Sequence, residues 1–273
     1  MDMPAWKYDR QSRRAVLKSP PLRLPGQSLD ERISELQEEF GNILVLPTCL
    51  TVLTVFEWTH WMTGSLPNPW VLTIATMLSI AYAWKKGKPL PGRIGRLRFG
   101  LEGERAVGQM LECLRDKGYR VFHDIPGPGF NIDHVLVGPA GVFAIETKTK
   151  SKPRDTHKIY YDGKTLRIGD QQVMDAPLVQ ARAQARWLTD QLNVGRKSIL
   201  TARPVVVFPE WYVVRTEQGN RSDVWVLNPK ELKNEFGNIL DQEPSILSAD
   251  LIDAAAHSIT QYVCISQSYK ATA

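Results

Sequence analysis

Two long stretches near the start of the chain carry almost no charge. The first runs from Ile43 to Met62 with a single acid inside it, and the second runs from Trp70 to Trp84. A helix that spans a bilayer needs about 20 apolar residues, with roughly 17 as the lower limit. The first stretch meets that length and the second comes close to it. Because tryptophans stand near the segment ends, as they do at membrane boundaries, residues 43–84 predict a transmembrane helical hairpin.

Basic residues lie on both sides of this predicted hairpin. Residues 1–25 contain six lysines and arginines against two acids, and residues 85–98 contain six with no acid. The positive-inside rule therefore predicts both flanks and both termini in the cytoplasm, with the hairpin in the inner or plasma membrane. The alternative is that the two segments are buried helices of a soluble protein. Residues 29–40 show apolar side chains at helical spacing and predict an amphipathic helix capped by Ser28.

The rest of the chain alternates helical and strand patterns. The expected elements are a helix over 102–117, a strand over 119–125, a hairpin over 131–148, a smaller hairpin over 158–168, a helix over 178–192, strands over 204–208 and 224–227, and a helix over 249–263. This order predicts an α/β fold in which helices flank a central mixed sheet. The lysine, arginine, proline and glycine of residues 85–98 predict a linker in front of that domain.

The most informative segment is Asn131–Lys148, in which two strand-like runs flank a glycine-proline turn. If Val137 pairs with Val142 across the turn, each step back moves both partners by one residue and sets Asp133 opposite Glu146. Opposed side chains in a sheet have Cβ atoms about 4.5–5.5 Å apart, and two like charges at that separation are destabilising. The sequence therefore predicts two facing carboxylates that need a positive charge between or beside them.

A divalent cation would supply that charge. Mg²⁺ prefers oxygen ligands from one or two carboxylates, together with water and phosphate. Since strand side chains alternate, Glu146 and Lys148 are expected on one face, with the ammonium beside the metal. There Lys148 would assist an attacking water or neutralise charge that develops on phosphorus. His134 points to the opposite face from Asp133, so a structural role is expected for it.

The bulk composition adds little. The formal net charge of +5 suits a partner with phosphates better than an acidic protein. The three cysteines are far apart and show no metal-binding spacing, which favours a reduced environment and packed thiols. No zinc-finger, helix-turn-helix or RNA-recognition signature is visible, so sequence-specific recognition has no support.

A family resemblance sharpens this picture. Asp133, followed after a hydrophobic strand by Glu146-Thr147-Lys148, resembles the Asp…(Asp/Glu)-x-Lys core of the restriction-endonuclease-like nucleases. With Gly103-Glu104-Arg105-Ala106-Val107 upstream and Ala176-Pro177-Leu178-Val179-Gln180 downstream, residues 99–192 resemble the nuclease-related domain called NERD. The resemblance implies a restriction-endonuclease-like fold whose catalytic residues are Asp133, Glu146, Lys148, Glu104 and Gln180. It implies Mg²⁺ or Mn²⁺ held by Asp133, Glu146 and Glu104, with Gln180 positioning the substrate or the lysine.

The predicted protein is a membrane-anchored, metal-dependent nuclease that hydrolyses phosphodiester bonds of nucleic acid, with DNA as the expected substrate. Its expected segments are an N-terminal cytoplasmic part (1–42), the membrane hairpin (43–84), the basic linker (85–98) and the nuclease-related domain with a C-terminal extension (99–273). One alternative is a non-catalytic nucleic-acid-binding or membrane scaffolding protein that keeps the fold. Another is a protein whose membrane hairpin is the working part, as a sensing or partner-binding element.

Overall fold

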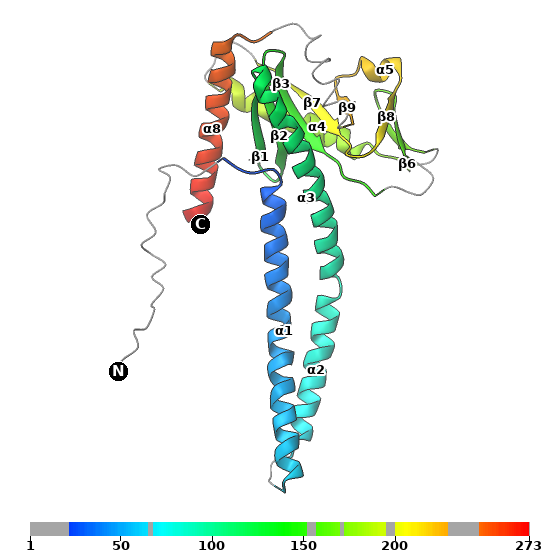
Figure 1. Ribbon diagram of the computed structural model, residues 1–273, viewed down its shortest axis with the longest axis vertical. Helices are drawn as coiled ribbons and strands as arrows, with labels where there is room; N and C mark the ends of the chain where they lie inside the picture. Colours follow the sequence, from blue (N-terminus) through cyan, green and yellow to red (C-terminus); the bar gives the residue numbers. More distant parts are fainter. Residues whose placement is uncertain are drawn as a thin grey trace, which may run out of the picture.

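The computed structural model describes residues 22–64, 68–151, 157–169, 172–194, 200–228 and 246–272 (Figure 1). Three helices form a long arm, and a head made of sheets and further helices lies at one end of it. The basic residues expected before residue 22, and residues 65–67 of the expected hairpin turn, lie outside the described residues.

The helices of the arm are α1 Gln27–Met62, α2 Trp70–Gly87 and α3 Leu90–Glu112. Residues 85–98, which were predicted as a linker, are helical over most of their length, because α2 continues to Gly87 and α3 begins at Leu90. A proline in the first turn suits the start of α3, since its missing N–H would have had no intrahelical partner there. The arm is therefore joined to the head by a helix that runs from one into the other (Figure 1).

α1 begins differently from the sequence prediction. The expected amphipathic helix over 29–40 and the expected spanning segment after it form one continuous helix. The predicted cap at Ser28 is wrong, because α1 begins at Gln27, after Gly26 in a left-handed conformation with φ of 69°. The hydroxyl and the N–H of Ser28 donate to Asp124 of the head instead. The start of α1 is thus fixed to the sheet rather than capped by its own residues.

Polar contacts join the facing sides of α1 and α2. The hydroxyl oxygens of Thr54 and Thr76 lie 2.6 Å apart, and Trp58 Nε1 donates to Thr73 Oγ1 at 3.0 Å. Large apolar side chains on the outer sides are exposed, and Val52 is 64% exposed. α1 is long and apolar enough to cross a membrane, and 11% of its most apolar 18-residue window is buried. A membrane span at α1 is therefore compatible with the structure, and a second span at α2 stays a prediction.

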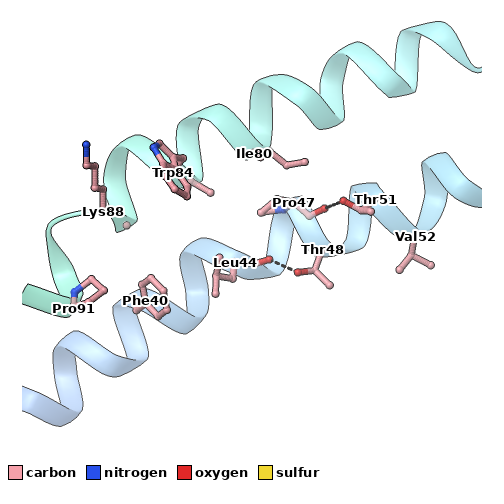
Figure 2. A pocket seen from close by; sticks show the side chains of 12 residues that line it. Phe40, Leu44, Pro47, Thr48, Thr51, Val52, Ile80, Trp84, Lys88 and Pro91 are labelled. Carbon is pink, nitrogen blue, oxygen red and sulfur yellow. Dashed lines mark hydrogen bonds between the residues drawn. The ribbon is translucent and has the colours of Figure 1, made fainter. Parts of the chain in front are cut away.

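An apolar hollow of 680 Å³ lies between α1 and α2 where they approach α3. Figure 2 shows Phe40 and Pro47 of α1 on one side of it and Trp84 of α2 on the other. Pro47 has no N–H to donate within the helix. The hydroxyls of Thr48 and Thr51 donate to carbonyl oxygens within α1, both at 2.7 Å. The hydroxyl groups of this part of the arm are therefore satisfied inside the helix, which leaves an apolar surface.

The head is built on a five-stranded mixed sheet in the order β1-β2-β3-β7-β9. Its strands are β1 Arg120–Pro126, β2 Asn131–Gly138, β3 Gly141–Thr147, β7 Ala202–Val207 and β9 Trp225–Leu227. β1, β2 and β3 pair antiparallel, whereas β7 and β9 continue from β3 in parallel. All five strands were predicted from their apolar runs, and the prediction of a mixed sheet flanked by helices is confirmed.

Helices cover both faces of this sheet. Alternation along β2 sends Val135 and Val137 toward α4 Ala176–Asn193 and α8 Ala249–Thr272, and sends Leu136 toward α3. By the same alternation, Asp133 and Glu146 lie on the face of the sheet that α4 and α8 cover. The short helix η1 Cys113–Lys117 links α3 to β1. The layer arrangement therefore aims both predicted acids at the N-terminal part of α4.

A second sheet lies beside the first, in the order β6-β5-β4-β8. It contains β4 Lys158–Tyr161, β5 Leu166–Ile168, β6 Gln172–Val173 and β8 Tyr212–Arg215, followed by the short helix α5 Glu217–Asn220. The predicted hairpin over 158–168 is confirmed as β4 and β5. β8 pairs in parallel with β4, although the two strands are far apart in the sequence. The local pattern of residues does not predict such a pairing.

Candidate active site

The hairpin of β2 and β3 has the register that the sequence predicts. Val137 pairs with Val142 across the turn. Continuing the same register places Asp133 across from Glu146 at the open end of the hairpin. There the backbone N–H of Thr147 donates to Asp133 Oδ2 at 2.6 Å, which joins the strands beyond their last regular pair. The two carboxylates therefore belong to one end of one hairpin.

Glu146 is a buried acid, with 2% of its surface exposed. Its Oε1 lies 2.5 Å from Lys148 Nζ, and its Oε2 accepts a hydrogen bond from Gln184 Nε2 at 2.5 Å. Gln184 Nε2 also donates to the carbonyl oxygen of Asn131 at 2.8 Å. A buried carboxylate without such partners would be very costly. Its partners therefore hold the Glu146 side chain in one orientation.

Lys148 is the outermost of these charged groups, since 31% of its side chain is exposed. Its ammonium donates to Gln180 Oε1 at 2.9 Å and lies against Glu146. The backbone N–H of Lys148 donates to the carbonyl oxygen of Val207 at 2.8 Å, which fixes the chain just after β3. The predicted placement of Glu146 and Lys148 on one face is therefore observed, and Gln180 contacts the lysine.

Glu104 of α3 is buried near the same acids. Burial, which is the largest cause, and the nearby carboxylates of Asp124 and Glu146 together raise the pKa of Glu104 to about 8. Burial also raises the pKa of Asp133 well above its usual range, with added repulsion from Glu146 and Glu104. These acids repel one another electrostatically, and Lys148 offsets only part of that repulsion. The site thus has an excess of carboxylates over cations.

Residues 23–28, which include the first two residues of α1, lie against Glu104, and we call them the strap. A Cβ atom added to Gly26 would lie 2.4 Å from Leu101 Cδ1 and 3.3 Å from Glu104 Oε2, and the φ of 69° also favours glycine there. Arg23 Nε donates to Asp124 Oδ2 at 2.7 Å, and both side chains are almost completely buried. Asp124 also accepts the two hydrogen bonds from Ser28. The strap therefore attaches the helical arm to the head directly beside the candidate site.

His134 lies on the other face of β2, as its position in the sequence predicts. Its Nδ1 is 2.9 Å from His123 Nδ1, and His123 Nε2 is 2.8 Å from Glu112 Oε1. Burial lowers the pKa of His134 well below its usual range, so the ring stays neutral at pH 7. Both histidines therefore lie on the face of the sheet opposite to Asp133 and Glu146.

The donor set at this site fits a hard divalent cation in part. Asp133, Glu146 and Glu104 offer oxygens, and the buried Gln184 Oε1 has no hydrogen-bond partner in the described part of the chain. Mg²⁺ accepts one or two carboxylates with water completing its shell. Within the described residues, however, no three histidine, cysteine or acidic side chains are grouped as a ready metal site. The chemistry of the donors is suitable, and the number of protein ligands is small.

Comparison with known proteins identifies the domain that contains this site. Residues 99–209 match the family model NERD, the nuclease-related domain. Residues 99–209 are therefore similar to nuclease-related domains. Searches among curated proteins and among solved structures each found no match. The matched range begins within α3 and ends just after β7, so the nuclease-related domain includes all five candidate residues, Glu104, Asp133, Glu146, Lys148 and Gln180.

Two residues of this region were missed by the sequence analysis. Gln184 follows Gln180 by one helical turn on α4, so both amides face the end of β3. That spacing was visible in the sequence, but which of the two contacts the acid was not. Asp124 has a left-handed φ of 51°, and its partners Arg23 and Ser28 lie about a hundred residues away. No local signal reveals such a contact.

Proposed function

We propose that this chain is a membrane-anchored nuclease that hydrolyses phosphodiester bonds of nucleic acid with the help of Mg²⁺ or Mn²⁺, with DNA as the expected substrate. The observation that carries the proposal is the convergence of Asp133, Glu146 and Lys148 at one end of a β-hairpin inside a nuclease-related domain. Two acids beside one exposed ammonium suit a reaction in which a phosphate and a cation must meet.

Each residue has a proposed role. Asp133 and Glu146 would hold the metal, and Glu104 would contribute through water. When bound, such an ion supplies positive charge to a phosphoryl oxygen and acidifies a bound water. Lys148 presents its ammonium at the exposed edge, where it orients the water that attacks phosphorus as one P–O bond breaks. Gln180 holds that ammonium by accepting its hydrogen bond.

The runner-up is a nucleic-acid-binding or scaffolding protein without turnover. Two observations favour it: the Lys148 ammonium is paired with Glu146, and the described acids do not form a three-ligand group. In that case the fold and a basic surface would remain useful without hydrolysis. The two proposals differ in whether covalent cleavage occurs.

A cleavage assay separates them. The full-length chain, purified in detergent, is incubated with supercoiled plasmid and with an end-labelled single strand in Mg²⁺, in Mn²⁺ and in EDTA. We expect cleavage with either metal, none in EDTA, and none with Glu146→Gln. The matched control is Glu39→Gln, which removes the same charge from an exposed position of α1 and should cleave like the wild type. Absence of cleavage by the wild type under all conditions would favour the runner-up.

The membrane anchor is proposed from α1, whose apolar side chains are exposed rather than packed in a core. An exposed apolar surface of this length needs lipid or a partner to cover it. Cys49 of α1 and Cys113 of the head are both exposed in the structure, which provides an internal comparison. In a Cys264→Ser background reconstituted in liposomes that are then opened, a water-soluble maleimide should label Cys113 and leave Cys49 unlabelled. Equal labelling of both before denaturation would contradict the anchor.

A further inference from the structure

The small sheet has one buried face and one exposed face. Ile159, Tyr161, Leu166 and Val213 point into the core of the head. The residues that alternate with them, on the other face, are Lys158 and Tyr160 of β4, Arg167 of β5 and Tyr212 of β8. Tyr160 is 41% exposed and Tyr212 is 61% exposed. Two aromatic rings and two cations therefore share a face that no described element covers.

The strand register brings the rings and the cations together. Tyr160 pairs with Arg167 on one side and with Val214 on the other, and Lys158 pairs with Tyr212. Directly paired side chains have Cβ atoms about 4.5–5.5 Å apart, and diagonal neighbours such as Tyr160 and Tyr212 about 7–8 Å apart. Each ring thus has a cation as its direct neighbour. The spacing of the two rings is short enough for bases one or two nucleotides apart in a strand to contact both.

A cavity of 280 Å³ opens on this face beside Tyr160 and Arg167. Asp162 also lines it, but its carboxylate accepts hydrogen bonds from Lys164 N–H, Thr165 N–H and the Thr165 hydroxyl. Asp162 Oδ2 also lies 3.8 Å from Arg167 Nη2, so its negative charge is engaged both in the β4–β5 turn and by the neighbouring guanidinium. The cavity combines a ring face, a guanidinium and a small volume, which are the features that accept a single flat base.

The face is also connected to the candidate active site. Trp211, the residue before Tyr212, donates its Nε1–H to the carbonyl oxygen of Lys150 at 3.1 Å. Lys150 lies two residues after Lys148, a distance of about 7 Å along an extended chain. The chain that carries the catalytic lysine is therefore attached to the start of β8.

We propose that this face is a stacking platform for unpaired bases and that the chain binds single-stranded nucleic acid through it. Aromatic rings stack on the flat faces of bases without regard to sequence, and neighbouring cations meet the phosphates. In a duplex the base faces are already stacked on one another, so exposed rings on a sheet select unpaired strands. This inference rests on the proposed nuclease function only in naming that strand as the substrate, and the binding itself does not require cleavage.

Binding is tested in EDTA with full-length protein in detergent, by fluorescence anisotropy of labelled oligo(dT), oligo(U) and a DNA duplex of equal length. The variant Tyr160→Thr/Tyr212→Thr removes both rings while keeping residues that favour strands. We expect it to weaken single-strand binding on the order of tenfold for each ring. Tyr160→Phe/Tyr212→Phe keeps the rings and should bind within about twofold of the wild type.

Charge variants provide a second readout. Lys158→Gln/Arg167→Gln should reduce the dependence of binding on salt by about one ion for each residue. Arg186→Gln, which removes a charge from an exposed position of α4, should leave that dependence unchanged. Far-ultraviolet circular dichroism checks that every variant is folded. Tighter binding of oligo(dT) or oligo(U) identifies the strand as DNA or RNA, and either supports the platform.

Two results would overturn the platform: wild-type affinity in the threonine variant, or duplex binding as tight as single-strand binding. Cleavage that is lost in Glu146→Gln while the threonine variant binds normally would refute the platform and leave the nuclease intact. Single-strand binding that depends on the rings, with no cleavage in any metal, would support the platform and refute the nuclease.

Discussion

The tie between the strap and the head can be tested through its buried ion pair. Arg23 Nε lies 2.7 Å from Asp124 Oδ2, with 3% and 1% of the two side chains exposed. Arg23→Ala leaves a buried carboxylate without its cation. Removing one partner of a buried pair costs about 3–5 kcal/mol. Since Asp124 keeps its hydrogen bonds from Ser28 and from Asn131 Nδ2, the cost should lie near the lower end.

The measurement is the thermal unfolding of the full-length protein in detergent, followed by tryptophan fluorescence. For a domain of this size, 1 kcal/mol changes the melting temperature by about 2–4 °C, so Arg23→Ala should lower it by about 6–12 °C. The control is Arg32→Ala, which breaks an exposed pair with Glu35 and should cost about 0–1 kcal/mol. The double variant Arg23→Met/Asp124→Asn should recover part of the loss, because neither charge is then left unpaired and asparagine tolerates the left-handed φ of residue 124. If Arg23→Ala is no more destabilising than Arg32→Ala, the strap is not held as described.

Two further predictions concern the site itself. The pKa of Glu104 is raised from 4.5 to about 8 on folding, so the folded state favours the protonated acid, and stability without metal should fall as pH rises from about 5 to 8. Glu104→Gln should flatten this decline in melting temperature. Melting temperatures that fall in parallel with pH for the wild type and the variant would disprove the prediction. Gln184→Leu removes the amide donor to Glu146 and should lower the free energy of unfolding, measured in urea, by about 1–3 kcal/mol. Gln191→Leu, in the last turn of α4, is the control. Equal losses of stability in the two variants would argue against a role for the contact between Gln184 and Glu146.

The register of the β2–β3 hairpin was predictable because two local signals agree. Apolar residues mark both strands, and the turn between Val137 and Val142 fixes which residues pair. A slip by one residue would have turned every side chain to the other face. Asp133, Glu146 and Lys148 were therefore brought together by sequence reasoning alone.

The start of α3 at Leu90 was missed because the prolines and glycines of residues 85–98 favour a linker over a helix. A glycine inside a helix is unfavourable by itself, by about 1 kcal/mol relative to alanine. Farther along α3, in the part that was predicted as a helix, a Cβ atom on Gly103 would meet Thr149, and one on Gly108 would meet Pro25. These glycines permit close packing of α3 against the site and the strap. That reason lies in tertiary contacts, so the local sequence does not contain it.

The strap contacts and the pairing of β8 with β4 could not be predicted from the sequence, for the same physical reason. Asp124 and Arg23 are 101 residues apart, and β8 reaches β4 only after the chain has passed through α4 and β7. Pairing over such separations is decided by the packing of the whole head. The exposed face with Tyr160 and Tyr212 appears only once β8 has taken its place.

The most direct measurement is the single-turnover rate at which the full-length chain cleaves a labelled strand in Mg²⁺, compared between wild type and Glu146→Gln at saturating protein. Replacing one buried carboxylate oxygen by an amide leaves the volume of Glu146 nearly unchanged. The account predicts cleavage by the wild type, loss of at least a hundredfold in the variant, and unchanged strand binding in EDTA. Equal rates for the two proteins, or no cleavage by either, would contradict it.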